Sequence, residues 1–218
     1  MDTRQQADSV RPPEDHYCSV YERDDERVAS LLRFIRGGLE RHEACVCVTE
    51  EALTTPVTAA LTLAGIDTVG EADQGSLAIL TPNDYGLVGK FRAEAMIASL
   101  AEASQKAEEL GFEALRVAED MTWTLELAIA PDEVRRYEAL LNAALSHSTF
   151  RHLCLYDRRR FAPAAMVTAL HTHRQVALGQ QLFANPYFEP PQLVLDNEIS
   201  ADRVAWMLQQ LRRYPIIS

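Results

Sequence analysis

The stretch Leu115–Trp123, LRVAEDMTW, has the composition of a buried strand that ends abruptly in charge. An apolar run interrupted only by Arg116 leads into two adjacent carboxylates, Glu119 and Asp120, and then into Met, Thr and Trp123. Such a run is typical of a strand covered on both faces of a parallel sheet. Because ligands bind outside the carboxyl ends of strands in open α/β sheets, this strand end is the expected place for a site.

The segments around this strand alternate between strand and helix patterns. Further strands are expected at 16–22, 44–49, 77–80, 150–156 and 175–177, and helices at 24–41, 56–64, 91–110, 123–128, 131–145 and 163–171. Two glycines, Gly37 and Gly38, are expected to loosen the end of the first helix. The alternation predicts an α/β fold of three layers, in which helices cover both faces of a mostly parallel sheet.

The two ends of the chain differ from this pattern. Residues 1–15 are polar and contain two prolines, which predicts a disordered leader. The α/β domain is expected over 16–196. Residues 197–218 follow as an amphipathic helix over about 200–214, a candidate docking or homodimer surface because its apolar residues share one stripe: Val204, Met207, Leu208 and Leu211.

The composition excludes several classes of protein. The 21 basic and 32 acidic residues give a net charge of −11, which argues against direct binding to nucleic acid. No apolar window reaches the length of a membrane span, and the N-terminus lacks the apolar core of a secretory signal, so a cytoplasmic protein is expected. The cysteines lack metal-site or haem spacing and are expected to be reduced core thiols, with no metal or cofactor: Cys18, Cys45, Cys47 and Cys154.

Several stretches together resemble the MEDS family of sensory domains. They are HYCSVYE, LLRFIRGGLERHEACVCVTEE, LRVAEDMTW, YDRRRF, THRQVA and ANPYFEPP, in this order between about residues 14 and 196. The resemblance implies a RecA/KaiC-like fold that has lost its phosphate loop. It also implies recognition of small molecules such as hydrocarbon derivatives, by a domain that occurs ahead of histidine-kinase or DNA-binding modules or alone. This chain departs from the family at Glu119-Asp120, where Gly-Glu is usual.

The residues after the first expected strand exclude a phosphate loop on chemical grounds. Such a loop needs several glycines and a Lys directly after a strand. Here the strand ends in Glu22, and Arg23, Asp24, Asp25 and Glu26 follow it. The carboxylates of the four acids would repel a triphosphate. No Gly-x-Ser-x-Gly motif occurs either. A catalytic function therefore has no support in the sequence.

The candidate ligand-binding residues are polar or aromatic and lie at strand ends or in the family-like stretches. Trp123 offers a flat surface for stacking, and arginines after a strand can hold a carboxylate or phosphate. For each of these residues a structural role stays open: helix capping for the acids, core packing for Trp123, and a salt-bridge cluster for the arginines. The full set is His16, Tyr21, Glu50, Arg116, Glu119, Asp120, Trp123, Tyr156, Asp157, Arg159, Asn185 and Tyr187.

The function that these features favour is a non-catalytic sensory domain. It would bind a small, largely apolar molecule at the strand ends and signal through a separate protein, either a histidine kinase or a transcription regulator. One alternative is a protein–protein regulator, such as a kinase or anti-sigma partner, without a small ligand. The other is a degenerate nucleotide-binding relative of the RecA-type ATPases.

Overall fold

Seven strands form a single sheet in the order β3-β2-β4-β5-β1-β6-β7. The computed structural model describes residues 16–84, 91–145, 150–196 and 201–211. All paired neighbours in the sheet are parallel except β6 and β7. The strands are β1 (His16–Tyr21), β2 (Ala44–Val48), β3 (Leu77–Leu80), β4 (Leu115–Asp120), β5 (Arg151–Asp157), β6 (Gln175–Leu178) and β7 (Gln181–Ala184).

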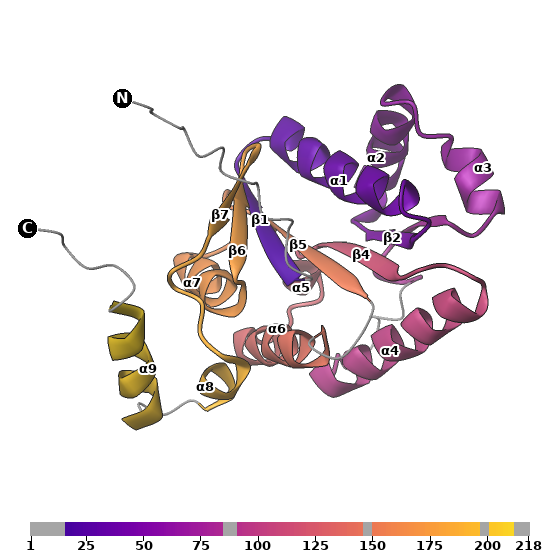
Figure 1. Ribbon diagram of the computed structural model, residues 1–218. Helices are drawn as coiled ribbons and strands as arrows, with labels where there is room; N and C mark the ends of the chain where they lie inside the picture. Colours follow the sequence, from indigo (N-terminus) through magenta and orange to yellow (C-terminus); the bar gives the residue numbers. More distant parts are fainter. Residues whose placement is uncertain (1–15, 85–90, 146–149, 197–200, 212–218) are drawn as a thin grey trace, which may run out of the picture.

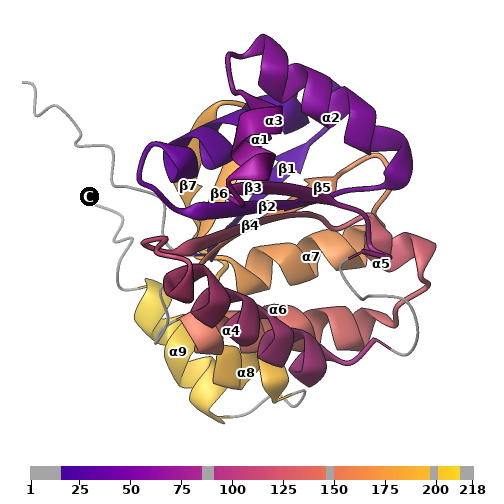
Figure 2. The same ribbon diagram turned by 90° about the vertical axis from the view of Figure 1, so that its right-hand side faces the viewer.

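Helices cover both faces of this sheet, so the expected three-layer α/β fold is confirmed (Figures 1 and 2). One layer holds α1 (Asp24–Leu39), α2 (Glu51–Leu63) and α3 (Thr68–Asp73). The opposite layer holds α4 (Ala93–Glu109), α5 (Trp123–Glu126), α6 (Pro131–Leu145) and α7 (Pro163–Thr172). Outside that layer lie α8 (Pro191–Leu195), which packs on α6, and α9 (Ala201–Leu211).

The core divides into two halves because successive side chains of a strand point to opposite faces. On the α1 face, Leu153 and Leu155 of β5 pack with residues of α1 and α2. On the other face, Cys154 and Tyr156 of the same strand pack with residues of α4, α6 and α7. All six residues of β4 are buried, as expected for a central strand covered on both sides.

Some boundaries and short elements differ from the sequence expectations. The second helix begins at Glu51 and not at Pro56, which lies inside it. Leu53 already donates to the carbonyl of Glu50, so the proline interrupts only a bond near the helix start. The sequence pattern did not predict the short elements α3, β7 and α8.

The two ends of the chain are described only in part. The leader expected at 1–15 lies outside the described residues, as do the flanks of the expected C-terminal helix, whose central part is α9. The division into leader, domain and appended helix stays a prediction. No described helix has both the length and the apolar character needed to cross a membrane.

The glycine pair does not loosen α1, because the helix runs through both residues to Leu39. Gly38 instead allows a close approach to the sheet. A Cβ atom there would lie 2.5 Å from both Cδ of Arg116 and Sγ of Cys45. A Cβ atom at Gly37 would lie 3.1 Å from the guanidinium end of the exposed Arg41 and in ordinary contact with Nη1 of Arg116, at 3.9 Å.

These two positions give a matched test of the packing of α1. Gly38→Ala is expected to lower the free energy of unfolding by about 1–3 kcal/mol, because buried neighbours must shift. Gly37→Ala is expected to be neutral or to stabilise by up to about 1 kcal/mol through helix propensity. Urea unfolding of both variants measures the difference, and equal effects would contradict the close approach at Gly38.

Candidate functional site

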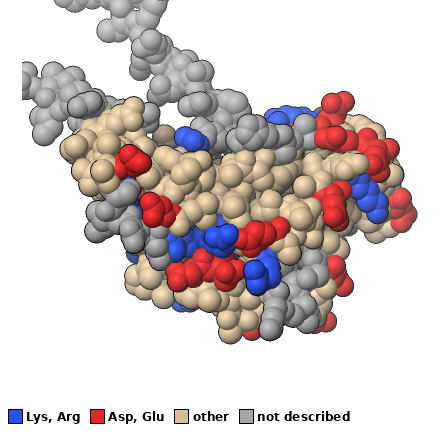
Figure 3. All heavy atoms as spheres, turned by 90° about the horizontal axis from the view of Figure 1, so that it is seen from below, with Lys and Arg blue, Asp and Glu red and all other residues tan. Residues whose placement is uncertain are grey.

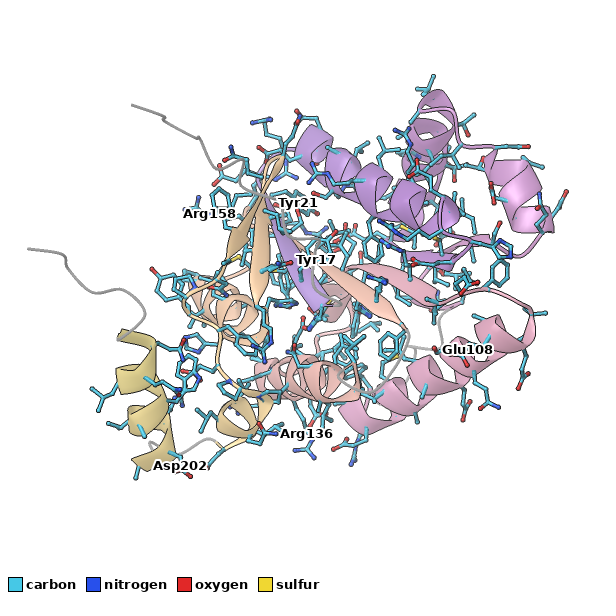
Figure 4. All side chains as sticks on the ribbon, viewed as in Figure 1. Tyr17, Tyr21, Glu108, Arg136, Arg158 and Asp202 are labelled. Atoms are coloured by element: carbon cyan, nitrogen blue, oxygen red, sulfur yellow. The ribbon has the colours of Figure 1, made fainter. Side chains whose placement is uncertain are left out.

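The carboxyl ends of β1, β2, β4 and β5 meet at one edge of the sheet, as the parallel pairing requires. This edge brings together Tyr21, Asp120 and Asp157, with Glu50 just beyond β2. Figure 4 shows Tyr21 and Arg158 near the same end of β1, where the N–H of Arg158 donates to the carbonyl of Tyr21 at 2.9 Å. The predicted convergence of polar residues at this edge is therefore observed.

Asp120 lies on the α1 side of the sheet and is buried, and both of its carboxylate oxygens have partners. Tyr21 donates its hydroxyl to Oδ2 at 3.3 Å, and the guanidinium of Arg27 in α1 lies 3.5 Å from the same oxygen. Oδ1 accepts from the N–H and the hydroxyl of Thr122, just before α5. Burial raises the pKa of Asp120 above its ordinary value, although Thr122 and Arg27 oppose this shift.

Glu119 points to the opposite face, because it is the next residue of the same strand. Its two oxygens accept from the hydroxyl of Tyr137 in α6 at 3.2 and 3.1 Å, and Nε2 of His152 lies 3.4 Å away. The adjacent acids that mark the sequence therefore do not form one site. Asp120 makes its contact with the α1 layer through Arg27, and Glu119 makes its contact with the α6 layer through Tyr137.

The arginines after β5 form salt bridges with acids at the same edge. Arg158 pairs with Glu22, and Arg160 pairs with Glu50. Arg159 binds Asp157 at 2.7 Å and Asp24 at 2.9 Å. Glu50 occupies the N-cap position of α2 without a capping hydrogen bond from its side chain. Of the two roles left open for the arginines, the structure shows the salt-bridge cluster.

The connection after β1 leaves no room for a phosphate loop. The strand ends at Tyr21 and α1 begins at Asp24, so only Glu22 and Arg23 connect them. Asp24, Asp25 and Glu26 occupy the first turn of the helix, where a nucleotide-binding protein presents N–H groups to phosphate. Negative side chains at this point disfavour the binding of a triphosphate.

The remaining predicted residues have structural contacts or lie elsewhere. Trp123 is 1% exposed and packs on Phe91, with ring centroids 5.1 Å apart. Arg116 lies near the amino end of β4 and pairs with Glu43. Asn185 donates to the carbonyls of Leu170 and His173, and Tyr187 is 62% exposed. Arg116, Asn185 and Tyr187 are not part of the strand-end group.

An apolar pocket of about 70 Å³ lies between α5, α6 and α7, beside the ends of β4 and β5. Its wall contains Tyr156 and Phe161, whose ring centroids are 5.1 Å apart. The other lining residues are Thr124, Leu125, Ile129, Pro131, Val134, Ala165 and Thr168. A larger and more polar cavity of about 290 Å³ is lined by His42, Glu43, Glu71 and Ser76 at the opposite edge of the sheet.

A buried polar cluster lies directly behind Tyr156. The Tyr156 hydroxyl donates to Oε1 of Glu138 in α6. The other oxygen of Glu138, Oε2, faces His16, His173 and Cys154. Burial raises the pKa of the Cys154 thiol, and Glu138 raises it further. Burial lowers the pKa of His173 well below its ordinary value, so this ring is neutral at pH 7.

Comparison with known proteins identifies the family. The model of the methanogen/methylotroph DcmR sensory domain, abbreviated MEDS, matches residues 15–174. The chain belongs to the MEDS family. It is also 28% identical over 160 residues to the transcriptional repressor DcmR of Methylorubrum extorquens. The match covers 73% of this chain and 58% of the repressor, and the two comparisons together support a regulatory sensory role.

Sequence reasoning missed several residues of this MEDS domain that hold the predicted ones in place. Glu138 and Tyr137 lie on the buried stripe of α6, and Arg27 lies on the buried stripe of α1. His152 and Cys154 lie inside an apolar strand. The only available signal was an ionisable residue at a helix position expected to face the core, which applies to Arg27 and Glu138.

The surface of the MEDS domain over α4, α6 and α8 carries both signs of charge in close alternation (Figure 3). Arg136 of α6 pairs with Glu94 of α4, and Arg135 pairs with Asp132. On this face, therefore, basic side chains do not form the continuous patch that a phosphate backbone requires.

The burial of Asp120 predicts a pH dependence of stability. Because its folded-state pKa is raised above the ordinary 3.8, charging this group opposes folding. Its contribution to the free energy of unfolding is full below pH 3.8 and is lost as pH rises through the raised value. Asp120→Asn should remove this loss, so that stability falls less steeply above pH 4 in urea unfolding.

Asp157 provides the control of opposite sign. Burial alone would raise its pKa, but hydrogen bonds from Arg159 lower it below 3.8 in the folded state. Its carboxylate therefore adds stability above that pH, which Asp157→Asn should remove. If the two substitutions changed the pH profile in the same direction, the assignment of Asp120 would be wrong.

Proposed function

We propose that this MEDS domain is a non-catalytic sensor that binds a small, largely apolar molecule in the pocket between α5, α6 and α7. The observation that supports this proposal is the chemistry of the pocket wall. Six of the nine lining residues have apolar or aromatic side chains without a hydroxyl: Leu125, Ile129, Pro131, Val134, Phe161 and Ala165.

The three hydroxyls in the wall are already committed to protein acceptors. Thr124 donates to the carbonyl of Met121 at 2.7 Å, and Thr168 donates to the carbonyl of Ala164 at 3.3 Å. Tyr156 donates to Glu138. A ligand in the pocket therefore meets few free hydrogen-bond donors, which favours an apolar molecule over a sugar, an amino acid or a nucleotide.

The size of the pocket favours a small ligand. A buried water needs about 10–15 Å³ by the same measure, so 70 Å³ fits a molecule of several heavy atoms. The polar cavity at the opposite edge is larger but has the acids Glu43 and Glu71 in its wall. Ligands of open α/β sheets bind at the carboxyl edge of the strands, which favours the apolar pocket.

The proposed signal is a shift between conformations. Thr124 and Leu125 follow the 119–123 segment, and Tyr156 and Phe161 bound the 156–161 segment, so one ligand would contact both. A bound molecule would favour one arrangement of these segments and of the C-terminal part of the chain. The acidic charge of −11 favours a separate cytoplasmic regulatory protein as the source of any contact with DNA.

A pair of neighbouring alanines in α7 tests the pocket. Ala165 lines it, whereas Ala164 is exposed on the same helix. Ala165→Leu should fill the pocket and abolish the methyl chemical-shift changes of Ile129 and Val134 on titration with chloroform, dimethyl sulfide and benzene. Ala164→Leu should leave them unchanged. The proposal fails if none of these probes shifts the two residues in the wild type, or if both variants respond alike.

A second candidate function, a protein–protein regulator without a small ligand, is favoured by one feature of α9. Its apolar residues Val204, Met207 and Leu208 are 46%, 53% and 53% exposed, although they share one stripe. The helix is tied to the domain by Arg203, which binds Glu189 at 2.7 Å. An apolar stripe that faces solvent is suited to pairing with the same stripe of a second copy.

Truncation after Asp196 tests whether α9 pairs two copies of the chain. The full chain is expected to be a dimer and the truncated chain a monomer when their masses are compared by size-exclusion chromatography with light scattering. The double variant Val204→Ser, Leu208→Ser in the full chain controls for the loss of other terminal residues and should also be monomeric. If all three chains had the mass of a monomer, the homodimer would lose its support.

A further inference from the structure

Four side chains with metal-binding atoms surround one point in the buried cluster behind Tyr156. His16 begins β1, Cys154 lies in β5, Glu138 lies in the middle of α6, and His173 follows the end of α7. One ligand atom from each lies within 4.8 Å of all the others. All four residues are buried, and none is a sequence neighbour of another.

The separations match the edges of a metal-centred tetrahedron. Bonds of 2.0–2.3 Å from zinc to nitrogen, oxygen and sulfur place the ligand atoms about 3.3–3.8 Å apart. Nε2 of His16 lies 3.2 Å from Oε2 of Glu138 and 3.5 Å from Sγ of Cys154. Oε2 of Glu138 lies 3.6 Å from this sulfur and 3.4 Å from Nε2 of His173.

The tautomer of His16 follows from its outer hydrogen bond. Its Nδ1 lies 3.1 Å from Oδ1 of Asn142. The amide nitrogen of Asn142 donates to the carbonyls of Glu138 and Thr172, which fixes Oδ1 as the atom that faces the ring. An amide oxygen can only accept, so Nδ1 of His16 carries a proton, and Nε2 is the ring nitrogen that can present a lone pair to the cluster.

His173 has the same orientation for an independent reason. Its Nδ1 lies 2.8 Å from the carbonyl oxygen of Ala169, which can only accept. The nearby hydroxyl of Thr172 donates to the carbonyl of Thr168. The proton therefore sits on Nδ1, and Nε2 faces the carboxylate of Glu138. This Nε2 atom is fully buried and makes no hydrogen bond to any described residue.

Two imidazole Nε2 atoms and a carboxylate oxygen thus face one another in the buried cluster. Three lone pairs at these distances repel one another unless a positive charge lies between them, either a proton on one of the nitrogens or a metal ion. The outer atoms are held as in metal sites, where the second nitrogen of each His donates to a carbonyl or amide and the ligating carboxylate accepts a further hydrogen bond. Here Tyr156 supplies that hydrogen bond to Glu138.

We propose that His16, Glu138, Cys154 and His173 bind one divalent transition-metal ion of the zinc type. Binding releases the thiol proton of Cys154 to solvent, forms a metal–thiolate bond, and changes no oxidation state. The charges of the thiolate and the carboxylate balance the +2 ion. Four protein ligands leave no open coordination position, so the ion ties β1, β5, α6 and α7 together instead of supplying a catalytic water.

The test uses the full chain purified without a histidine tag. Elemental analysis after extensive dialysis is expected to give about one equivalent of zinc per chain. Unfolding in the presence of a chelator and refolding with Co²⁺ should produce the intense visible bands of a tetrahedral ion and a thiolate-to-cobalt charge-transfer band in the near ultraviolet. This band reports the ligation of sulfur directly and needs no variant.

Matched variants locate the site. Cys154→Ser should abolish the charge-transfer band, and His173→Gln should reduce the bound metal well below one equivalent. Cys47→Ser and His152→Gln are the controls, because Cys47 is equally buried on the other face of the sheet and His152 faces Glu119. Both controls should keep the metal and the band, and circular dichroism verifies that each variant is folded.

Three outcomes would overturn the proposal. The wild-type chain could contain far less than one equivalent of zinc, iron, cobalt, nickel and copper combined, and fail to take up Co²⁺ on refolding. The cobalt form could lack the thiolate band. The controls could lose the metal as completely as Cys154→Ser. Any of these would leave the cluster as a hydrogen-bonded network of a carboxylate and two imidazoles.

Discussion

A strand that is covered on both faces must find a partner inside the protein for every polar side chain it carries, because water is excluded from both sides. The strand β4 has three such side chains among its six residues. Arg116 is paired with Glu43, Asp120 with Arg27 and Tyr21, and Glu119 with Tyr137 and His152. These contacts orient α1 on one face and α6 on the other, so the position of both helix layers depends on them.

The same constraint explains why the carboxyl edge of the sheet does not resemble a nucleotide site. The short connection between β1 and α1 leaves no room for a loop around a phosphate, and the acids in the first turn of α1 place negative charge beside the N–H groups that would bind it. Arginines after β5 neutralise these acids: Arg158 pairs with Glu22 and Arg159 with Asp24. The strands end together at this edge as in other open α/β sheets, but the charged side chains there form salt bridges with one another.

Tyr156 connects the apolar pocket and the buried cluster on the α6 face of the sheet. Its ring lines the apolar pocket, and its hydroxyl donates to Glu138 in the buried cluster. Glu138 in turn contacts residues of β1 and β5 and the residue that follows α7. A change in the packing of this one ring therefore reaches four elements through direct contacts.

The sequence by itself determined the layers, most of the strands and the convergence of polar residues at one sheet edge. Hydrophobic periodicity is a local property, and parallel strands necessarily end together. Tertiary structure alone decided the partner of each polar side chain. Glu119 and Asp120 are adjacent in the chain but face opposite layers, whereas His16 and Cys154 are 138 positions apart and lie in contact. Such partners are chosen by strand order and helix packing, which no local pattern records, so the buried cluster around Glu138 could not be seen in the sequence.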